Sequence, residues 1–429
     1  MSKNQLFAGA GAAAIRFPQE IFPLESFQGV HDEPHARVLL LECGLRTAIV
    51  CMELVMLPDE EIALLRRMIG ELTGTPEEHI WVHVTHAITT PHAPHAPKGM
   101  GGVDLEISEE ERRTLDRKIG IFNAAVEDAV GRAARAAAAS FRPARMGVGA
   151  GECHVNMNRD ISTPFGWWIN FAPDGPSNHT ATILKFEDEA GAAIGALISY
   201  GLKPCAIDNS EMGKDTRLIS SDVPGLACTL LEEKLGAPCL FAMSAAGDQV
   251  PLEQAWYAVV NDDGTVSEVD LGVQAGLEMV DRLGRRMAQE LEPVLTGTVC
   301  DQTAPEIRMD QGGIEWQGKE RCQMKPTKKA EYVPKGSHRL DAHVMALGDV
   351  ALVAVKPEVN TVTEAQLHAA SPFAHTLLMS MVNGGFKYMP DLASYENSTW
   401  EAQNCALMPG AAEAWVAQAA DVLERVRGR

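Results

Sequence analysis

The stretch His79-Ile-Trp-Val-His-Val-Thr-His86-Ala-Ile-Thr-Thr-Pro-His92-Ala-Pro-His95 joins a short apolar run to a histidine-rich loop that is broken by prolines. The run predicts a buried strand that ends near His86, and the residues after it predict a loop. Strand ends often carry chemistry, because the strand holds the backbone while the loop faces a ligand. Neutral imidazole is the commonest metal ligand and a proton carrier near pH 7. We therefore expect a metal or acid–base site that begins at His86.

The other four histidines of this stretch have a simpler interpretation. His79 and His83 alternate with apolar residues of the strand and so point to its other face. His92 and His95 lie among prolines and alanines, as solvated loop residues do. The pattern therefore singles out His86.

Further strands are predicted by apolar, β-rich runs along the chain. They cover residues 37–43, 47–54, 180–186, 194–200, 238–244 and 350–355. Two pairs of runs meet at Gly44 and at Gly191, and each pair predicts a hairpin. Apolar residues at three- and four-residue spacing predict helices over residues 59–72, 108–139, 222–235, 276–291 and 411–426.

Strands that alternate with helices and include hairpins predict an α/β fold, namely an α/β/α sandwich around a mixed β-sheet. No repeat or low-complexity linker divides the sequence, so we expect a single compact catalytic domain over residues 1–429. Residues 303–338 are polar and irregular, and predict a long loop or a flap over a site.

Composition narrows the class of protein and its partners. The net charge of −21 disfavours nucleic acid and anionic membranes as partners, and no apolar run is long enough to span a membrane. The nine cysteines are scattered without Cys-x-x-Cys spacing, which indicates reduced thiols and a cytoplasmic protein. We expect a small-molecule substrate. The oligomeric state, a homo-oligomer included, stays open.

Several short motifs follow one another along the chain in a recognisable order. They are Gly29-Val-His31 with Ala36-Arg37, Val84-Thr-His86-Ala-Ile88-Thr-Thr-Pro91, Val155-Asn-Met-Asn158-Arg159, Leu184-Lys-Phe186, Ser199-Tyr-Gly-Leu-Lys203-Pro204, Leu218-Ile-Ser-Ser-Asp222-Val-Pro-Gly225, Ala246-Gly247-Asp248-Gln-Val-Pro251, Val353-Ala-Val-Lys-Pro-Glu358, Asn383-Gly-Gly-Phe-Lys-Tyr388 and Trp400-Glu401-Ala402. Together they resemble the catalytic N-terminal domain of the neutral/alkaline (non-lysosomal) ceramidase family. The likeness covers most of the chain, although each motif alone is short.

This resemblance implies a hydrolase whose zinc is held by a histidine of a Thr-His-Thr-His loop, a His-Pro histidine, a late glutamate and a tyrosine. Three of these positions correspond to His86, Glu358 and Tyr388. The family's substrate-facing arginine corresponds to Arg159. The resemblance therefore implies a zinc site on His86, Glu358 and Tyr388, beside a substrate-binding Arg159.

Three other positions depart from the family pattern. Lys203 stands at the position of the His-Pro histidine, Ile88 at that of the second loop histidine, and Trp400 at that of a late tyrosine. An ammonium group has no lone pair with which to bind zinc. Lys203 could instead replace the charge of the metal by pairing with Glu358.

Two catalytic hypotheses follow, and the sequence leaves both open. In the first, a metal persists and assists hydrolysis of an amide or ester bond in a small polar or carboxylate-bearing metabolite. Its ligands would be His86, Glu358 and Tyr388, completed by His92, His95, Cys205 or Asp208.

In the second hypothesis no metal binds, and Lys203 is the general base or Schiff-base nucleophile of an isomerase, epimerase or lyase. Under either hypothesis Arg159 can hold a substrate carboxylate in a bidentate fork. A third alternative is a non-catalytic metabolite-binding protein. The predicted catalytic residues are Lys203, Arg159, Tyr388 and Trp400.

Ceramide itself is not the expected substrate. Ceramidases of this family are typically secreted and carry an additional C-terminal β domain. This sequence begins without a recognisable signal and ends in an alanine-rich helix, which favours a smaller cytoplasmic metabolite.

Overall fold

The larger of two main sheets contains eight strands and is mixed. The structure is a computed structural model that describes residues 5–95, 106–211 and 216–428. The strand order is β12 (Cys239–Met243), β10 (Ala193–Tyr200), β9 (Thr180–Asp188), β6 (Arg142–Glu152), β1 (Phe7–Ala14), β3 (His35–Cys43), β4 (Leu45–Met52) and β5 (Ile80–Val84). The pairs β10–β12 and β4–β5 are parallel, and the other pairs are antiparallel.

The two predicted hairpins are confirmed. Strands β3 and β4 pair in antiparallel register around Gly44, and β9 and β10 pair around Gly191. Both glycines have a positive φ, +82° and +87°, which a residue with a side chain rarely adopts. Local turn chemistry therefore sets these two hairpins.

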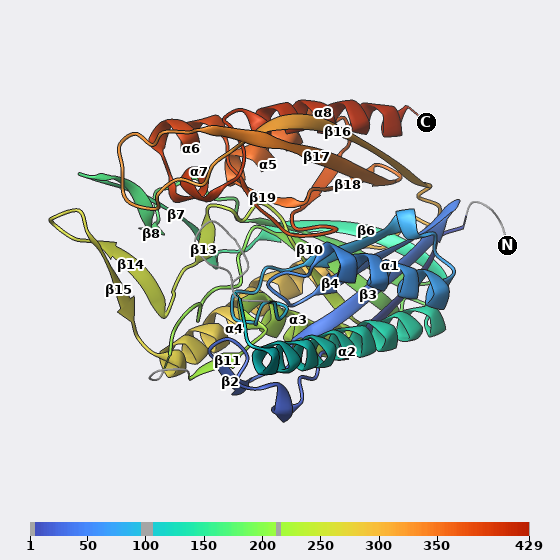
Figure 1. Cartoon of the computed structure of the whole chain (residues 1–429). Coiled ribbons are helices and arrows are strands. Elements are labelled where there is room, and N and C mark those ends of the chain that lie inside the picture. Colours follow the sequence, from blue (N-terminus) through green and yellow to red (C-terminus); the bar gives the residue numbers. More distant parts are fainter. Residues whose placement is uncertain (1–4, 96–105, 212–215, 429) are drawn as a thin grey trace.

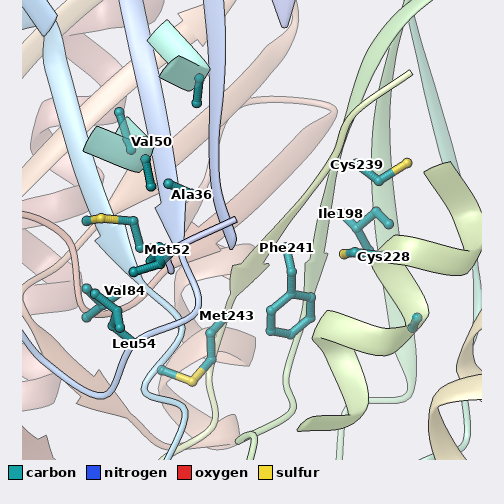
Figure 2. Close-up of a cluster of buried hydrophobic side chains, with 14 of the residues drawn as sticks. Ala36, Val50, Met52, Leu54, Val84, Ile198, Cys228, Cys239, Phe241 and Met243 are labelled. Carbon is teal, nitrogen blue, oxygen red and sulfur yellow. The ribbon is translucent and has the colours of Figure 1, made fainter. Parts of the chain in front are cut away.

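Four helices cover one face of this sheet. They are α1 (Asp59–Thr73), α2 (Glu109–Ala139), α3 (Asp222–Leu235) and α4 (Val273–Gly297), close to the predicted ranges. Helix α2 begins with a capping box, in which Ser108 and Glu111 satisfy each other's backbone N–H groups. Figure 2 shows part of the core between sheet and helices, including Val50, Met52 and Phe241.

A second sheet packs on the opposite face of the first. Its order is β16 (Ile307–Lys319), β17 (Pro334–Leu347), β18 (Val350–Ala354) and β20 (His375–Met379). Leu39 and Trp81 of the large sheet share a buried cluster with Met345 and Leu352 of the second sheet. Helices α5 (Thr361–Ala370) and α8 (Ala411–Arg427) cover its outer face (Figure 1). The predicted α/β sandwich around a mixed sheet is confirmed, and the structure adds this second sheet.

The prediction of an irregular segment over residues 303–338 is wrong for residues 307–319 and for residues 334–338, which begin β17. Residues Ile307–Lys319 form β16, which pairs along nearly its whole length with β17. The segment reads as polar because much of this hairpin is only partly buried. A strand with one exposed face carries fewer apolar residues, so its sequence gives a weaker strand signal.

The remaining elements are short, and many lie at the left of Figure 1. They include β7 (Asn156–Thr163), β8 (Gly166–Ala172), β13 (Gln249–Pro251), β14 (Trp256–Val260), β15 (Val266–Asp270), β19 (Pro357–Val359), β21 (Phe386–Met389), α6 (Leu392–Asn397) and α7 (Trp400–Asn404). Strands β2 (Phe27–Val30) and β11 (Arg217–Ile219) form a separate pair. None of the described helices is long and apolar enough to cross a membrane.

Candidate active site

The predicted catalytic residues come from strand ends and short elements far apart in the sequence. Lys203 follows the end of β10, Arg159 lies in β7, and Trp400 begins α7. Glu358 in β19 and Tyr388 in β21 are direct partners in the parallel register of these two strands. This pairing brings the carboxylate and the phenol side by side.

Lys203 lies at the centre of the group. Its Nζ donates hydrogen bonds to Glu358 Oε2 at 2.9 Å and to Tyr388 Oη at 3.0 Å. Lys203 is 2% exposed and Glu358 is fully buried. Burial and Arg159 oppose the charged amine, but Glu358 and Tyr388 outweigh them and raise the pKa of Lys203 above its ordinary value. Lys203 is therefore an ammonium ion.

His86 lies on the other side of the same carboxylate. Its Nδ1 is 2.7 Å from Glu358 Oε1, but the pair lacks the alignment of a hydrogen bond. Burial would raise the pKa of Glu358, yet His86 and Lys203 together lower it to about 2. The φ of His86 is +57°, a left-handed conformation that is uncommon for a residue with a side chain and is often found at functional sites.

Arg159 is held by a carboxylate of the protein. Its Nε and Nη2 donate to Glu401 Oε1 at 2.8 and 2.5 Å. Its guanidinium carbon lies 5.2 Å from the ring centre of Trp400 and 5.5 Å from that of Tyr388. Glu401 and the two aromatic rings thus fix the orientation of Arg159.

A second carboxyl group lies beside this ion pair. Burial raises the pKa of Asp160 well above its ordinary value, and the nearby carboxylate of Glu401 raises it further. The site thus disfavours a second negative charge on Asp160 next to Glu401, whose Oε1 accepts the hydrogen bonds of Arg159.

These side chains border a cavity of about 300 Å³. Arg159, Lys203, Tyr388 and Trp400, the four predicted catalytic residues, all line it. Further lining residues are Ile88, Trp168, Cys205, Asp208, Val250, Trp256 and Tyr257. His86 and Glu358 contact Lys203 or each other but are not part of the cavity wall. The structure therefore brings together all six predicted catalytic and metal-binding residues.

Two lining residues, Asp208 and Cys205, carry titratable groups whose pKa values are raised. Burial raises the pKa of Asp208 to about 6, against the lowering effect of Arg217, Lys203 and Arg159. Burial, with Asp208 and Asp222, raises the pKa of the Cys205 thiol well above its ordinary value. Asp208 thus suits proton transfer near neutral pH, whereas Cys205 is a poor nucleophile.

Sequence reasoning missed some of these roles. Glu401 stands within a recognised motif, but nothing local shows that it pairs with Arg159. Trp256 and Tyr257 belong to the β14–β15 hairpin, which no sequence signal connects to the site. His92, an alternative metal ligand, instead contacts Glu25, with 3.0 Å between Nδ1 and Oε1. His95, another alternative, is exposed.

Comparison with solved structures identifies the fold as similar to that of neutral ceramidase. The crystal structure of neutral ceramidase from Pseudomonas aeruginosa matches with a TM-score of 0.71 and 16% identity, covering 99% of this chain and 75% of that chain. A structure of ceramidase complexed with C2 also matches with a TM-score of 0.71 and 16% identity, covering 99% of this chain and 76% of that chain. No family model and no curated protein matches the sequence. The resemblance to the ceramidase family is thus confirmed for the fold.

The predicted zinc ligands lie together but do not fit a zinc ion as they stand. The ammonium of Lys203 is bound to two of the three donors, Glu358 and Tyr388. It offers no lone pair, and its charge opposes a dication beside it. Within the described ranges, no group of three or more His, Cys, Asp and Glu side chains is placed to hold a metal ion. The zinc site therefore stays a prediction that this donor set does not support.

Proposed function

We propose that the protein hydrolyses an amide or ester bond of a small molecule in the cavity beside Lys203. One observation carries this proposal: a cavity of about 300 Å³ is bordered by a buried ammonium, Lys203, and by a carboxyl group of raised pKa, Asp208. Hydrolysis of an acyl bond is accelerated by a hydrogen-bond donor that stabilises negative charge on the carbonyl oxygen and by a base that takes a proton from water. The ceramidase-like fold is consistent with this reaction class.

Lys203 would bind the carbonyl oxygen. Glu358 and Tyr388 accept two of its three N–H groups in the described part of the chain, which leaves the third for an oxygen in the cavity. Among the described residues, the Tyr388 hydroxyl accepts from Lys203 and has no acceptor of its own, so its O–H can donate as well. Both groups are held in place before the reaction, so they stabilise the negative charge that develops on the oxygen.

Asp208 would move the proton. Its carboxylate takes a proton from water as the water oxygen attacks the carbonyl carbon. The resulting oxyanion faces Lys203. When the C–N or C–O bond breaks, Asp208 returns the proton to the leaving nitrogen or oxygen, and an acid and an amine or alcohol are released. No oxidant, reductant or further reactant is needed.

The cavity wall suggests the kind of substrate. Trp168, Trp256 and Tyr257 form much of an apolar and aromatic surface, which suits a short acyl or aryl group. Arg159 also lines the cavity and can meet a substrate carboxylate, although Glu401 already accepts two of its N–H groups. N-acyl amino acids combine both features.

The test is a screen of the purified full chain with amides and esters of small acids, N-acyl amino acids and a short-chain ceramide. We expect release of the acid from at least one of the small amides or esters. Lys203→Met and Asp208→Asn should lower kcat/KM about 10²–10⁴-fold, while the matched variant Lys185→Met, at another buried and ion-paired lysine, should not.

Two outcomes would replace this proposal with the alternatives. Trapping of a carbonyl substrate on Lys203 by borohydride would point to Schiff-base chemistry, which the raised pKa of Lys203 argues against. Binding of a metabolite without turnover would point to a non-catalytic protein.

A further inference from the structure

We propose that Lys203 is the built-in cation of this site, and that the site works without a metal because the ammonium takes two of the three donors that a metal would need. The inference concerns the same residues as the proposed hydrolysis. It is tested by metal binding without substrate, so the two proposals can fail separately.

The position of the ammonium is set by two paired strands. Glu358 and Tyr388 are partners in the register of β19 and β21, and Lys203 Nζ lies 2.9 and 3.0 Å from their oxygens. The same Nζ is 4.7 Å from the ring centre of Tyr388. A lysine that bonds to both partners of one strand pair, with almost no exposure, is a fixed part of the site.

The charges near Glu358 are already balanced. A fully buried carboxylate is costly unless a cation compensates it. Lys203 meets Oε2 and His86 lies at Oε1, so both oxygens face a basic side chain. A zinc ion would add two positive charges next to the ammonium and would have to compete with it for the same oxygens.

The cluster of His86, Glu358 and Tyr388 would become a metal site if residue 203 offered a lone pair in place of an ammonium group. His86 Nδ1 and Glu358 Oε1 lie 2.7 Å apart without an aligned hydrogen bond to each other or to another group of the described chain. His86 and Glu358 supply a nitrogen and an oxygen donor of the kinds that zinc accepts in catalytic sites, and Tyr388 stands at the tyrosine position implied by the ceramidase resemblance. The obstacle is the side chain of Lys203, so an imidazole at this position should turn the cluster into a zinc site.

The experiment titrates zinc chloride into wild-type protein and Lys203→His, after both have been dialysed against a chelator. We expect one zinc per chain in Lys203→His, bound at least roughly 100-fold more tightly than any zinc in wild type, and lost again in Lys203→His/His86→Ala. Calorimetry gives affinity and stoichiometry, and elemental analysis gives the metal content. Zinc should raise the Tm of Lys203→His and leave that of wild type unchanged.

Wild-type protein provides the decisive outcome even if Lys203→His does not fold. One tightly bound zinc in wild type, lost on His86→Ala, would overturn the proposal. A folded Lys203→His that binds zinc no better than wild type would also overturn it. Absence of hydrolytic activity would affect the proposed function alone, because none of these measurements uses a substrate.

Discussion

Arg159, which lines the cavity, forms a buried ion pair with Glu401. The exposed fractions of their side chains are 8% and 0%. Two buried charges that bind each other add little net stability, but either one alone is costly. A substitution that removes only one charge of the Arg159–Glu401 pair should therefore lower the stability of the protein.

Replacing Arg159 by methionine should show this dependence. Arg159→Met leaves the carboxylate of Glu401 buried without its cation, and we expect a loss of about 3–5 kcal/mol in the free energy of unfolding. Addition of Glu401→Gln should restore part of the loss, because the uncompensated charge disappears. Urea unfolding of the wild type, both single variants and the double variant measures the coupling. Strictly additive effects would contradict the prediction.

His83 is a buried neutral imidazole, which makes it a source of acid sensitivity. Its Nδ1 faces the carbonyl oxygen of Ser380 at 2.8 Å, and its Nε2 accepts from the backbone N–H of Met243 at 3.1 Å. These partners require a proton on Nδ1 and none on Nε2. Burial lowers the pKa of His83 to about 4.

The direction in which pH changes the stability follows from the linkage between folding and proton binding at His83. Between pH 6.5 and about 4 the unfolded chain binds a proton at His83 and the folded chain does not, so stability falls as the pH falls through this window. The full contribution is about 3 kcal/mol. We expect the stability difference between wild type and His83→Gln to decrease by this order on acidification, as followed by urea midpoints at several pH values. Parallel pH curves for both proteins would refute this role.

Among the elements, β1 depends on its glycines rather than on strand propensity. Its sequence, Phe-Ala-Gly-Ala-Gly-Ala-Ala-Ala, holds no β-branched residue, yet the strand lies in the middle of the large sheet. A Cβ on Gly9 would lie 2.2 Å from the carbonyl oxygen of Ala137, and one on Gly11 2.2 Å from that of Ala133. Both oxygens belong to α2, so the glycines allow this helix to pack directly on the strand.

Substitution of Gly9 by alanine should therefore destabilise the protein by about 1–3 kcal/mol or more, because helix and strand must separate. Gly120→Ala is the matched control on α2, where an added Cβ meets nothing within 4 Å. It should instead stabilise the helix by up to about 1 kcal/mol. Thermal unfolding of both variants measures the contrast. Equal Tm values for the two variants would disprove close packing at Gly9.

Across the whole molecule, stability is unevenly distributed between the layered core and the cavity wall. Central strands such as β3 are buried on both faces, whereas Ala258 is the one buried residue of the β14–β15 hairpin. Backbone amides with little buried surface around them open at low cost. The part of the cavity wall formed by Trp256 and Tyr257 is thus the more adaptable part.

Amide hydrogen exchange should report this difference. We expect the amides of β14 and β15 to exchange roughly 100-fold or more faster than those of β1 and β3. Exchange followed by proteolysis and mass spectrometry gives the rates segment by segment. Equal protection in both regions would show that the hairpin is as firmly anchored as the core.

Much of the fold and part of the site could be predicted from the sequence. Short-range periodicity and turn residues predict five of the helices, α1, α2, α3, α4 and α8, and both glycine hairpins. Strand β1 and the β16–β17 hairpin do not, because their burial depends on distant partners. The clustering of His86, Lys203, Glu358 and Tyr388 was predicted, whereas the ion pair of Arg159 with Glu401 was not. The chemical role of these residues stays a prediction.

The sequence by itself determined most helices, both glycine hairpins and the mixed α/β class, since these depend on neighbours a few positions apart. The site residues were predicted from the resemblance to the ceramidase family. Tertiary structure alone decided what those residues are chemically. Lys203 meets Glu358 across 155 positions, and Arg159 meets Glu401 across 242. Charge state and hydrogen bonding depend on such partners and on burial, which folding supplies. The cytoplasmic location and the small-molecule substrate stay predictions.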